Sequence, residues 1–546
     1  MGTTYVLPKL LYVSLYMLYG SAIGYIAIFY DEELNMTSQE IGLLLATPYF
    51  VQIISSPLWT MIADKHPHFQ GRLMSLLTFL GGSSVLALLF LADLVKTLAG
   101  PIVFWLAMCL ALAFSFFGSP LVALVDSSVL KILGDQKVLY GNQRLWGSIS
   151  NGVCLFAVGI MVSSVGIRSS FYLFAAGMAL LILFCSMTKF DDYDALLEEQ
   201  QTLLSKSEAR GNYAYSPLQE QRTSSDILDD DRQSRRSSIV TTHTTSAPPF
   251  FQQQPVDQSS IWRRDSIASH ANTLLLDEDD NRRYHQLLQT ITTTTTYAAM
   301  GAQQEASQIM SNLDQDEYPS VGLVLSHIPT VETSLAAFAL VGQQDNLPLE
   351  KSTLKSLRVQ TFMMMVLLFG LGYSMISQFL FLIYRNDIGM NPSLMGLTGP
   401  LAGVAEVMTF WLSKKLFDRF SVTTLTTMAH LFFVIRNMIF MMLKSNDTLS
   451  ITLALGLQIV NGFCYAMMWS TAVAEVDTFF PEDQRGLAQG ILGVLFSGLG
   501  YGLGSVLSGF VYDQYGYRYL LGVSASITLF GLAVFYIGKW QPRGNP

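Results

Sequence analysis

Long apolar runs contain Asp126, Glu406 and Arg436, and Arg144 directly precedes another, so each of these four charged residues could carry chemistry. A charge at bilayer depth costs roughly 2.5–3.5 kcal/mol on insertion scales, so such a residue normally faces a polar cavity and a partner. A carboxylate there can bind a polar solute or carry a proton, and a guanidinium suits polar or anionic ligands. Two plainer interpretations stay open. Glu406 and Arg436 could form a structural ion pair, and Arg144 could extend from a helix end toward water.

The bulk composition places most of the chain in a membrane. Only 13% of the 546 residues are charged, about half of the ~25% found in soluble domains. The net charge of −9 does not indicate nucleic-acid binding, because much of the acid lies in one polar insert. The four cysteines lie in apolar runs without disulfide or metal-ligand spacing, and no phosphate-binding loop occurs. We therefore expect no cofactor, no metal and no ATP-driven step.

Apolar runs long enough to cross a bilayer, about 20 residues each, predict an all-α membrane protein with twelve transmembrane helices. Backbone groups in lipid must pair within their own segment, so each run is expected to be helical. The runs span residues 10–30, 41–62, 73–93, 101–130, 145–165, 169–188, 360–384, 393–413, 424–443, 449–473, 486–511 and 518–538. They divide the chain into a six-helix bundle at 1–190, a linker at 191–355 and a second six-helix bundle at 356–546.

The two halves share one register. An offset of 354 positions (384 − 30) joins Tyr30 to Tyr384, Gly42 to Gly396 and Asp64 to Asp418. Equal spacing over such a length indicates a duplicated half, and transporters are commonly built from such repeats. The same offset places Glu406 on Gln52, so the second half has an ionisable group where the first has a neutral amide.

The distribution of Lys and Arg predicts the orientation. Basic residues concentrate in the turns after even-numbered spans, such as Lys65, Arg72 and Arg144, and this excess favours the cytosolic side. Both termini are therefore expected in the cytosol. Two glycosylation sequons, at Asn35 and Asn446, fall in turns on the opposite side. Either the plasma membrane or a vacuolar or other internal membrane fits this pattern.

The linker at 191–355 differs in chemistry from the spans. It is rich in Gln, Ser, Thr and Asp, and this composition predicts a largely disordered cytosolic segment. Serines near paired arginines, at Ser237, Ser238 and Ser266, could be phosphorylated by basophilic kinases. Such motifs are common in disordered segments, so an incidental occurrence is the plainer interpretation.

Twelve spans in two repeated halves, joined by a long cytosolic loop, resemble the major facilitator superfamily. The turn Ala63-Asp64-Lys65, followed by Gly71-Arg72, resembles the best-known loop motif of that superfamily, although Thr60 stands where glycine is usual. The resemblance implies that charges at these helix ends latch the two halves in one access state. Solvated helix-end charges are the alternative. The expected gating residues are Asp64, Lys65, Arg72, Asp418 and Arg419.

Within the superfamily, both membrane halves resemble the lactose-permease-like proton symporters. The segment Tyr140-Gly141-Asn142-Gln143-Arg144-Leu145-Trp146-Gly147 is similar to the start of that family's fifth helix, whose arginine binds sugar hydroxyls beside a fourth-helix acid. The resemblance implies this role for Arg144, and Asp126 is the acid available in the fourth helix. Glu406 matches the substrate-binding glutamate of the family's eighth helix, and Arg436 matches the arginine of its ninth.

The proton site of that family is not retained. Its histidine and glutamate in the tenth helix are replaced here by Asn461 and Cys464. Its charge pair between the seventh and eleventh helices is replaced by Ser374 and Ser497. Losing both members of a pair together is physically coherent, because keeping one would leave an unpaired charge.

Other positions of the expected site match. Tyr373 and Gln378 stand where the family has a Tyr and a Gln and, with Asn461, are expected to line the substrate site. Glu406 is then the best available proton acceptor, modulated by Arg436.

These features predict a monomeric secondary active transporter that moves a small polar organic solute, sugar- or nucleoside-like, by alternating access. Proton symport is favoured, and uniport is the first alternative. A receptor or scaffold that signals through the linker is the second. A membrane enzyme is disfavoured, because the spans contain no Ser/His/Asp or His-rich constellation and His430 has no such companions.

Overall fold

The computed structural model describes residues 6–133, 140–188, 356–480 and 485–540, which belong to one compact unit. Within these ranges every regular element is a helix and no strand occurs, which confirms the predicted all-α class. Apolar spans become helices because a helix pairs its own N–H and C=O groups without water. The predictions for the linker at 191–355, including its kinase sites, lie outside the described residues.

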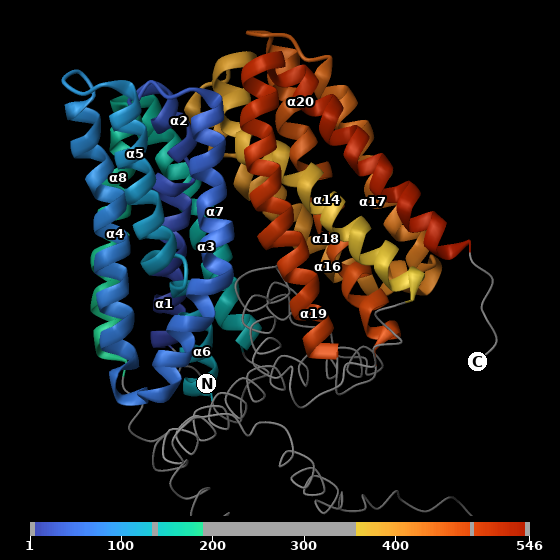
Figure 1. Cartoon of the computed structure of the whole chain (residues 1–546), viewed down its shortest axis with the longest axis horizontal. Helices are drawn as coiled ribbons and strands as arrows, with labels where there is room; N and C mark the ends of the chain where they lie inside the picture. Colours follow the sequence, from blue (N-terminus) through green and yellow to red (C-terminus); the bar gives the residue numbers. More distant parts are fainter. Residues whose placement is uncertain (1–5, 134–139, 189–355, 481–484, 541–546) are drawn as a thin grey trace, which may run out of the picture. The chain divides into compact units, whose positions relative to one another are not determined.

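The described part of the first half makes six crossings, drawn in blue to green in Figure 1. Its helices are α1 (Val6–Leu18), α2 (Ile26–Glu32), α3 (Ser38–Lys65), α4 (Gln70–Leu94), α5 (Gly100–Ala113), α6 (Leu121–Leu133), α7 (Tyr140–Val165) and α8 (Ser170–Met187). The π-helical turns η1 (Tyr19–Ile23) and η3 (Phe114–Gly118) connect α1 to α2 and α5 to α6, so each of these pairs makes one crossing.

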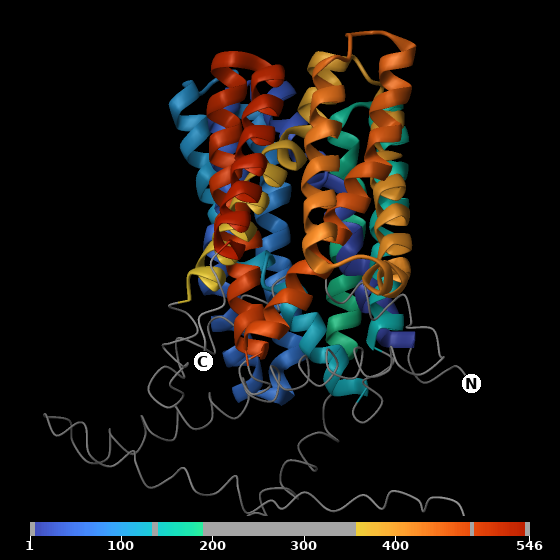
Figure 2. The same ribbon diagram turned by 90° about the vertical axis from the view of Figure 1, so that its right-hand side faces the viewer.

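The second half, drawn in yellow to red, begins at residue 356. Its helices are α14 (Leu357–Leu382), α15 (Pro392–Met395), α16 (Thr398–Arg419), α17 (Val422–Met441), α18 (Thr448–Phe479), α19 (Arg485–Gly493) and α20 (Tyr501–Lys539). The π-helical turn η8 (Ile383–Ile388) extends α14, and η10 (Val494–Gly500) joins α19 to α20. The helices of this half run alongside one another in both views (Figures 1 and 2).

Ten described helical runs are long and apolar enough to cross a membrane. The longest of them, Gly490–Lys539, holds two crossings, because the helix breaks at Gly516 with φ of 78° and ψ of 176°. Tyr512, before the break, donates a 2.6 Å hydrogen bond to Asp387 at one end of the seventh span. Gly538, after the break, packs on Thr361 at the other end. Adding α16, whose charged residues make it less apolar, completes the predicted twelve crossings.

Several polar contacts between the halves lie at the end of the helices that carries the loops with Asn35 and Asn446. We name this the Asn35 end and the opposite one the Asp64 end. Ser163 Oγ donates a 2.7 Å hydrogen bond to the side chain of Asn391 across the halves. At the same end, α3 packs along α20 and α7 packs along α15.

Polar contacts between the halves at the Asn35 end repeat with two-fold symmetry. Arg385 donates to Glu32 at 2.7 Å, and Asn386 donates to Asp31 at 2.9 Å. The offset of 354 makes Asp31 the counterpart of Arg385, and Glu32 the counterpart of Asn386. Each residue therefore contacts the counterpart of its neighbour, which is the pattern of an isologous two-fold interface.

Two close helix contacts obey the same symmetry. A Cβ on Gly42 of α3 would lie 2.8 Å from Gly509 Cα of α20. A Cβ on Gly396 would lie 2.7 Å from the Leu155 carbonyl of α7. Gly42 and Gly396 are counterparts, and so are Leu155 and Gly509. Glycine is required at both places because the facing backbone leaves no room for a side chain.

We expect Gly42→Leu to force the Asn35 end apart, because its Cβ would meet the Ser505 carbonyl at 2.6 Å. Overpacking of this kind costs about 1–3 kcal/mol, which shifts the population of the closed state by roughly 5- to 150-fold. Spin labels on cysteines placed at Thr97 and Ser445 should report a longer mean distance. Gly456→Leu is the matched control, since nothing lies within 4 Å of its Cβ. An unchanged distance distribution in Gly42→Leu would contradict the prediction.

Candidate substrate and proton site

Arg144 and Asp126 form a buried ion pair between α7 and α6. Arg144 Nη1 lies 3.2 Å from Asp126 Oδ2, and the two side chains are 1% and 2% exposed. Tyr12 of α1 donates a 2.6 Å hydrogen bond to the other carboxylate oxygen. The structure thus brings together two residues that the sequence analysis assigned to one site. Arg144 lies in the protein interior, which differs from the alternative of a side chain extended to water.

Glu406 lies on the inner face of α16. Val404 and Met408 on the same helix are 61% and 54% exposed, as expected of lipid-facing side chains. They precede and follow Glu406 by two residues, so Glu406 points about 160° away from each at ~100° per residue. Glu406 is therefore directed away from lipid.

The inner face of α16 begins in contact with α7 and then opens. Gly399, Gly403 and Glu406 share this face, because they are spaced at i, i+4 and i+7. A Cβ on Gly399 would touch Leu155 of α7, whereas a Cβ on Gly403 has nothing within 4 Å. The two halves thus separate along α16 from the Asn35 end toward Glu406.

The Glu406 carboxylate has no cation beside it among the described residues. Its Oε1 is buried and accepts no hydrogen bond. Arg436 of α17 is occupied elsewhere: Nη1 donates to the Asn437 side chain at 2.9 Å, and Nε faces the Leu457 carbonyl at 3.4 Å. Its guanidinium also lies over the ring of Phe440, 5.4 Å from the centroid. A direct ion pair between Glu406 and Arg436, the structural alternative from the sequence, is not formed in these contacts.

Tyr373 lies in the same region as Glu406 and Arg436, close enough to interact electrostatically with each. Its hydroxyl accepts a 2.9 Å hydrogen bond from Asn461 Nδ2 of α18. The ring of Tyr465 lies 5.4 Å from that of Tyr373, between centroids. Three residues expected at the site from the sequence, namely Tyr373, Asn461 and Glu406, therefore meet around one aromatic cluster.

The cluster extends to the first half of the chain. Gln378 donates a short hydrogen bond to the Tyr49 hydroxyl of α3. The ring of Tyr49 packs on Tyr501 at 5.2 Å, and Tyr501 lies 6.2 Å from Tyr373. Tyr465 is also within electrostatic range of Arg144. The Arg144–Asp126 pair and Glu406 thus border one aromatic-lined region that both halves share.

The expected gating residues lie apart from this region, at the Asp64 end. Asp64 pairs with Lys131 of α6 at 2.8 Å, within its own half of the chain. Lys131 also donates to Gln70 of α4 at 2.7 Å. The side chains of the others are exposed, with Arg72 stacked over Phe69 at 5.6 Å. Those other residues are Lys65, Arg72, Asp418 and Arg419.

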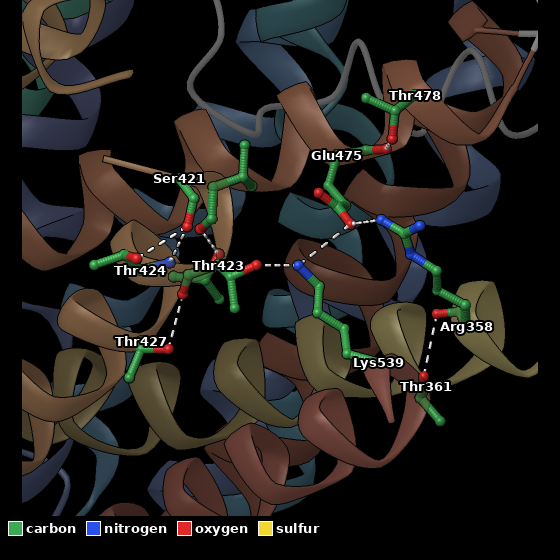
Figure 3. A network of polar contacts seen from close by, with 11 residues as sticks. Arg358, Thr361, Ser421, Thr423, Thr424, Thr427, Glu475, Thr478 and Lys539 are labelled. Carbon is green, nitrogen blue, oxygen red and sulfur yellow. Dashed lines mark hydrogen bonds and ion pairs between the residues drawn. The ribbon is translucent and has the colours of Figure 1, made fainter. Parts of the chain in front are cut away.

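A second network at the Asp64 end was not expected from the sequence. Glu475 of α18 accepts a 2.7 Å hydrogen bond from Arg358 of α14, and Lys539 of α20 approaches the same oxygen to 3.9 Å. Lys539 also contacts the Thr423 hydroxyl at the start of α17, as Figure 3 shows. Four helices of the second half are thereby tied together. The available signal was one acid and two bases at the ends of three apolar runs.

The two sequon asparagines share an unusual backbone geometry. Asn35 and Asn446 are exposed, and their φ angles of 51° and 56° make them the only non-glycine residues with positive φ in the described ranges. Asparagine tolerates this left-handed conformation better than most residues. Both lie in tight turns at the Asn35 end.

The chain is similar in sequence to known membrane proteins. The sequence profile of the MFS_1 like family matches residues 5–522. The maltose permease of Geobacillus stearothermophilus is 29% identical over 184 residues, which is 34% of this chain and 43% of the permease. The uncharacterized transporter YwbF of Bacillus subtilis (strain 168) is 28% identical over 140 residues, which is 26% of this chain and 32% of YwbF. The chain aligns with less than half the length of either relative.

Solved structures share the fold. A mutant of the nucleoside transporter NupG superposes with a TM-score of 0.59 at 14% identity, over 98% of this chain and 100% of NupG. A mutant of the peptide transporter POT in complex with sulfate gives a TM-score of 0.51 at 11% identity, over 98% of this chain and 94% of POT. At these identities the likeness concerns the fold alone, and it agrees with the predicted arrangement of two six-helix bundles.

We expect Asp126→Asn to destabilise the protein strongly, because it leaves the buried Arg144 charge without its carboxylate. Breaking a buried pair in this way costs about 3–5 kcal/mol. The double variant Asp126→Asn/Arg144→Gln should regain part of this loss in a thermal unfolding measurement. Asp93→Asn is the control: its pair with Arg168 is exposed, so the expected loss is below about 1 kcal/mol. A double variant less stable than Asp126→Asn would contradict the prediction.

Proposed function

Since the chain belongs to the MFS_1-like family of the major facilitator superfamily, we propose that it carries a small polar organic solute across a membrane by alternating access. The observation that carries this proposal is Glu406: a carboxylate on the inner face of α16 with a buried, unpartnered oxygen. A buried polar group without a partner costs free energy. Such a group is retained where a ligand or a proton completes it.

A sugar- or nucleoside-like solute suits the surroundings of Glu406. Tyr373, Asn461 and the Arg144–Asp126 pair supply hydroxyl, amide and guanidinium groups that can pair with solute hydroxyls. The tyrosine rings offer apolar faces on which a ring can pack. One relative in sequence is named as a maltose permease, which supports a sugar-like solute. Arg144, Asp126, Glu406, Tyr373, Gln378 and Asn461 are the proposed binding residues.

Glu406 is also the proposed proton carrier. When it binds a proton the carboxyl becomes neutral and gains an O–H donor, which can pair with a solute oxygen. Release of that proton restores a charge that the protein interior disfavours. Binding of the solute and binding of the proton therefore favour each other. This arrangement supports proton symport. It requires no proton transfer by Cys464.

The proposed access state is open toward the Asp64 end. Asp31, Glu32, Arg385 and Asn386 join the halves at the Asn35 end, whereas α7 and α16 separate beyond Pro400. With the orientation indicated by Lys and Arg, the termini and the open end face the cytosol. We propose that these halves meet at the Asp64 end in the other access state, through Asp64, Lys65, Arg72, Asp418 and Arg419.

The remaining assignments follow from this topology. Asn35 and Asn446 are proposed glycosylation sites on the non-cytosolic side of the plasma membrane or an internal membrane. The linker at 191–355, on the cytosolic side, is proposed as a kinase substrate. One chain contains both bundles, so the proposed transporting unit is a monomer.

We expect Glu406→Gln to abolish pH-gradient-driven accumulation of solute in proteoliposomes, with uptake falling to the level of protein-free vesicles. Glutamine keeps the shape of the side chain but cannot exchange a proton. Exchange of solute at equal pH on both sides should survive, because it needs no net proton movement. Glu40→Gln is the control, since that carboxylate only caps α3 at the exposed Asn35 end.

The same assay separates the alternatives. Uptake by the unmodified protein that ignores the pH gradient would indicate uniport. Solute binding without any flux would favour a receptor or scaffold. Accumulation that is unchanged in Glu406→Gln would overturn the proposed proton role of Glu406.

A further inference from the structure

We propose that Trp469 recognises the solute: its indole N–H donates a hydrogen bond to an oxygen on a solute ring that packs along α18. This inference rests on the proposed function and names a contact that the sequence analysis did not assign. The solute chemistry it selects is a ring bearing an acceptor oxygen. Either a hydroxyl of a sugar ring or a carbonyl of a pyrimidine base supplies such an oxygen.

Trp469 lies on the face of α18 that lines the site. Asn461, Tyr465 and Trp469 are spaced four residues apart, which places them on one side of the helix. Asn461 donates to Tyr373, and Tyr465 is in electrostatic range of Glu406. Asn461 and Tyr465 on this face border the region around Glu406. Trp469, on the same face, therefore borders that region farther along α18.

Ring contacts attach Trp469 to the same aromatic cluster. Its ring lies 5.6 Å from that of Phe496, which also lies 6.0 Å from Tyr465 and 5.6 Å from Tyr501. Phe496 thus packs against three rings that each carry a polar group, those of Trp469, Tyr465 and Tyr501. This packing holds the Trp469 ring in place without any hydrogen bond from its N–H.

The indole nitrogen is an unmet donor. Trp469 is 4% exposed, and its Nε1 is buried without a hydrogen-bond partner. Five buried side-chain atoms in the described ranges lack a partner: Ser56 Oγ, Gln143 Oε1, Glu406 Oε1, His430 Nε2 and Trp469 Nε1. Trp469 Nε1 is the one among them that can only donate, so only an acceptor can complete it. The carboxylate of Glu406 and the indole of Trp469 therefore offer complementary groups to one ligand.

The position of Trp469 fits a solute that arrives from the Asp64 end. The chain of α18 runs from the Asn446 loop to Glu475, that is, from the Asn35 end to the Asp64 end. Four residues of helix place Trp469 about 6 Å closer to the Asp64 end than Tyr465. A Cβ on Gly462 would lie 3.1 Å from Glu406 N, so Glu406 begins near Gly462, seven residues or about 10 Å before Trp469 along α18. A solute of two linked rings, such as a disaccharide or a nucleoside, is long enough to span this interval.

Trp469→Phe tests the contact, because it keeps an aromatic ring and removes only the N–H. Purified full-length protein in proteoliposomes would be assayed with radiolabelled maltose and, separately, radiolabelled uridine. For the probe that is carried, we expect KM to rise about 3- to 10-fold, as the loss of one hydrogen bond implies, with the maximal rate kept. Trp105→Phe is the matched control, since Trp105 is 64% exposed on the outside of the helices.

Analogues of the carried probe that each lack one oxygen identify the partner of the indole. One analogue should have the same KM with the unmodified protein and with Trp469→Phe, because its hydrogen bond is already missing. The analogue also shows whether the oxygen belongs to a sugar or to a base. A KM that rises equally for every analogue would indicate a structural effect and overturn the inference.

The two proposals fail in different ways. Uptake that needs Glu406 but has the same KM in Trp469→Phe overturns the role of Trp469 alone. Absence of uptake of both probes by the unmodified protein overturns the proposed solute class and this inference together.

Discussion

The site depends on one constraint: Glu406 lies among tyrosine hydroxyls and rings, and no cation of the described residues pairs with its carboxylate. In a low-dielectric interior a charge must be paired or neutralised. The other buried acids meet this requirement within the protein: Asp126 has Arg144 and a tyrosine hydroxyl, and Glu475 has Arg358 and Lys539. Within the described residues no group pairs with Glu406 Oε1, and we propose that a proton or the solute does so. Its environment is therefore poised to respond to a proton or a solute, whereas the paired acids hold helices together.

The structure combines a symmetric closure with an asymmetric site. At the Asn35 end, each half contributes the same set of positions to the contact, and both charged groups and glycines obey the offset of 354. Contacts of this kind are made or broken as a set, because a rotation about the two-fold axis moves both copies equally. The symmetry does not extend to Glu406, whose counterpart under the same offset is Gln52. Duplication thus accounts for the matched contacts at the Asn35 end, and divergence between the halves accounts for an acid that only the second half carries.

The sequence alone predicts much of the fold and part of the site. The apolar runs predicted the crossings, including α16, whose charges make it the least apolar. Arg144 with Asp126 and Tyr373 with Asn461 were named as site residues, and each pair is in contact. The contacts of Arg436 were not foreseen: its guanidinium is satisfied by Asn437, a carbonyl and aromatic rings. The sequence also does not predict two networks of helix-end charges, because such charges are usually solvated. These are the Glu475 network and the contacts among Asp31, Glu32, Arg385 and Asn386.

The sequence by itself determined the helical class, the number of crossings and the repeat, because each of these follows from local patterns of apolarity and from spacing along the chain. It also singled out Glu406, since an acid in an apolar run is costly wherever the helix packs. Only the tertiary structure decided which groups that acid meets. The groups that surround Glu406, Tyr373 and Trp469 come from helices far apart in the chain. Whether a buried atom finds a hydrogen-bond partner there depends on rotations of those helices that no local pattern specifies.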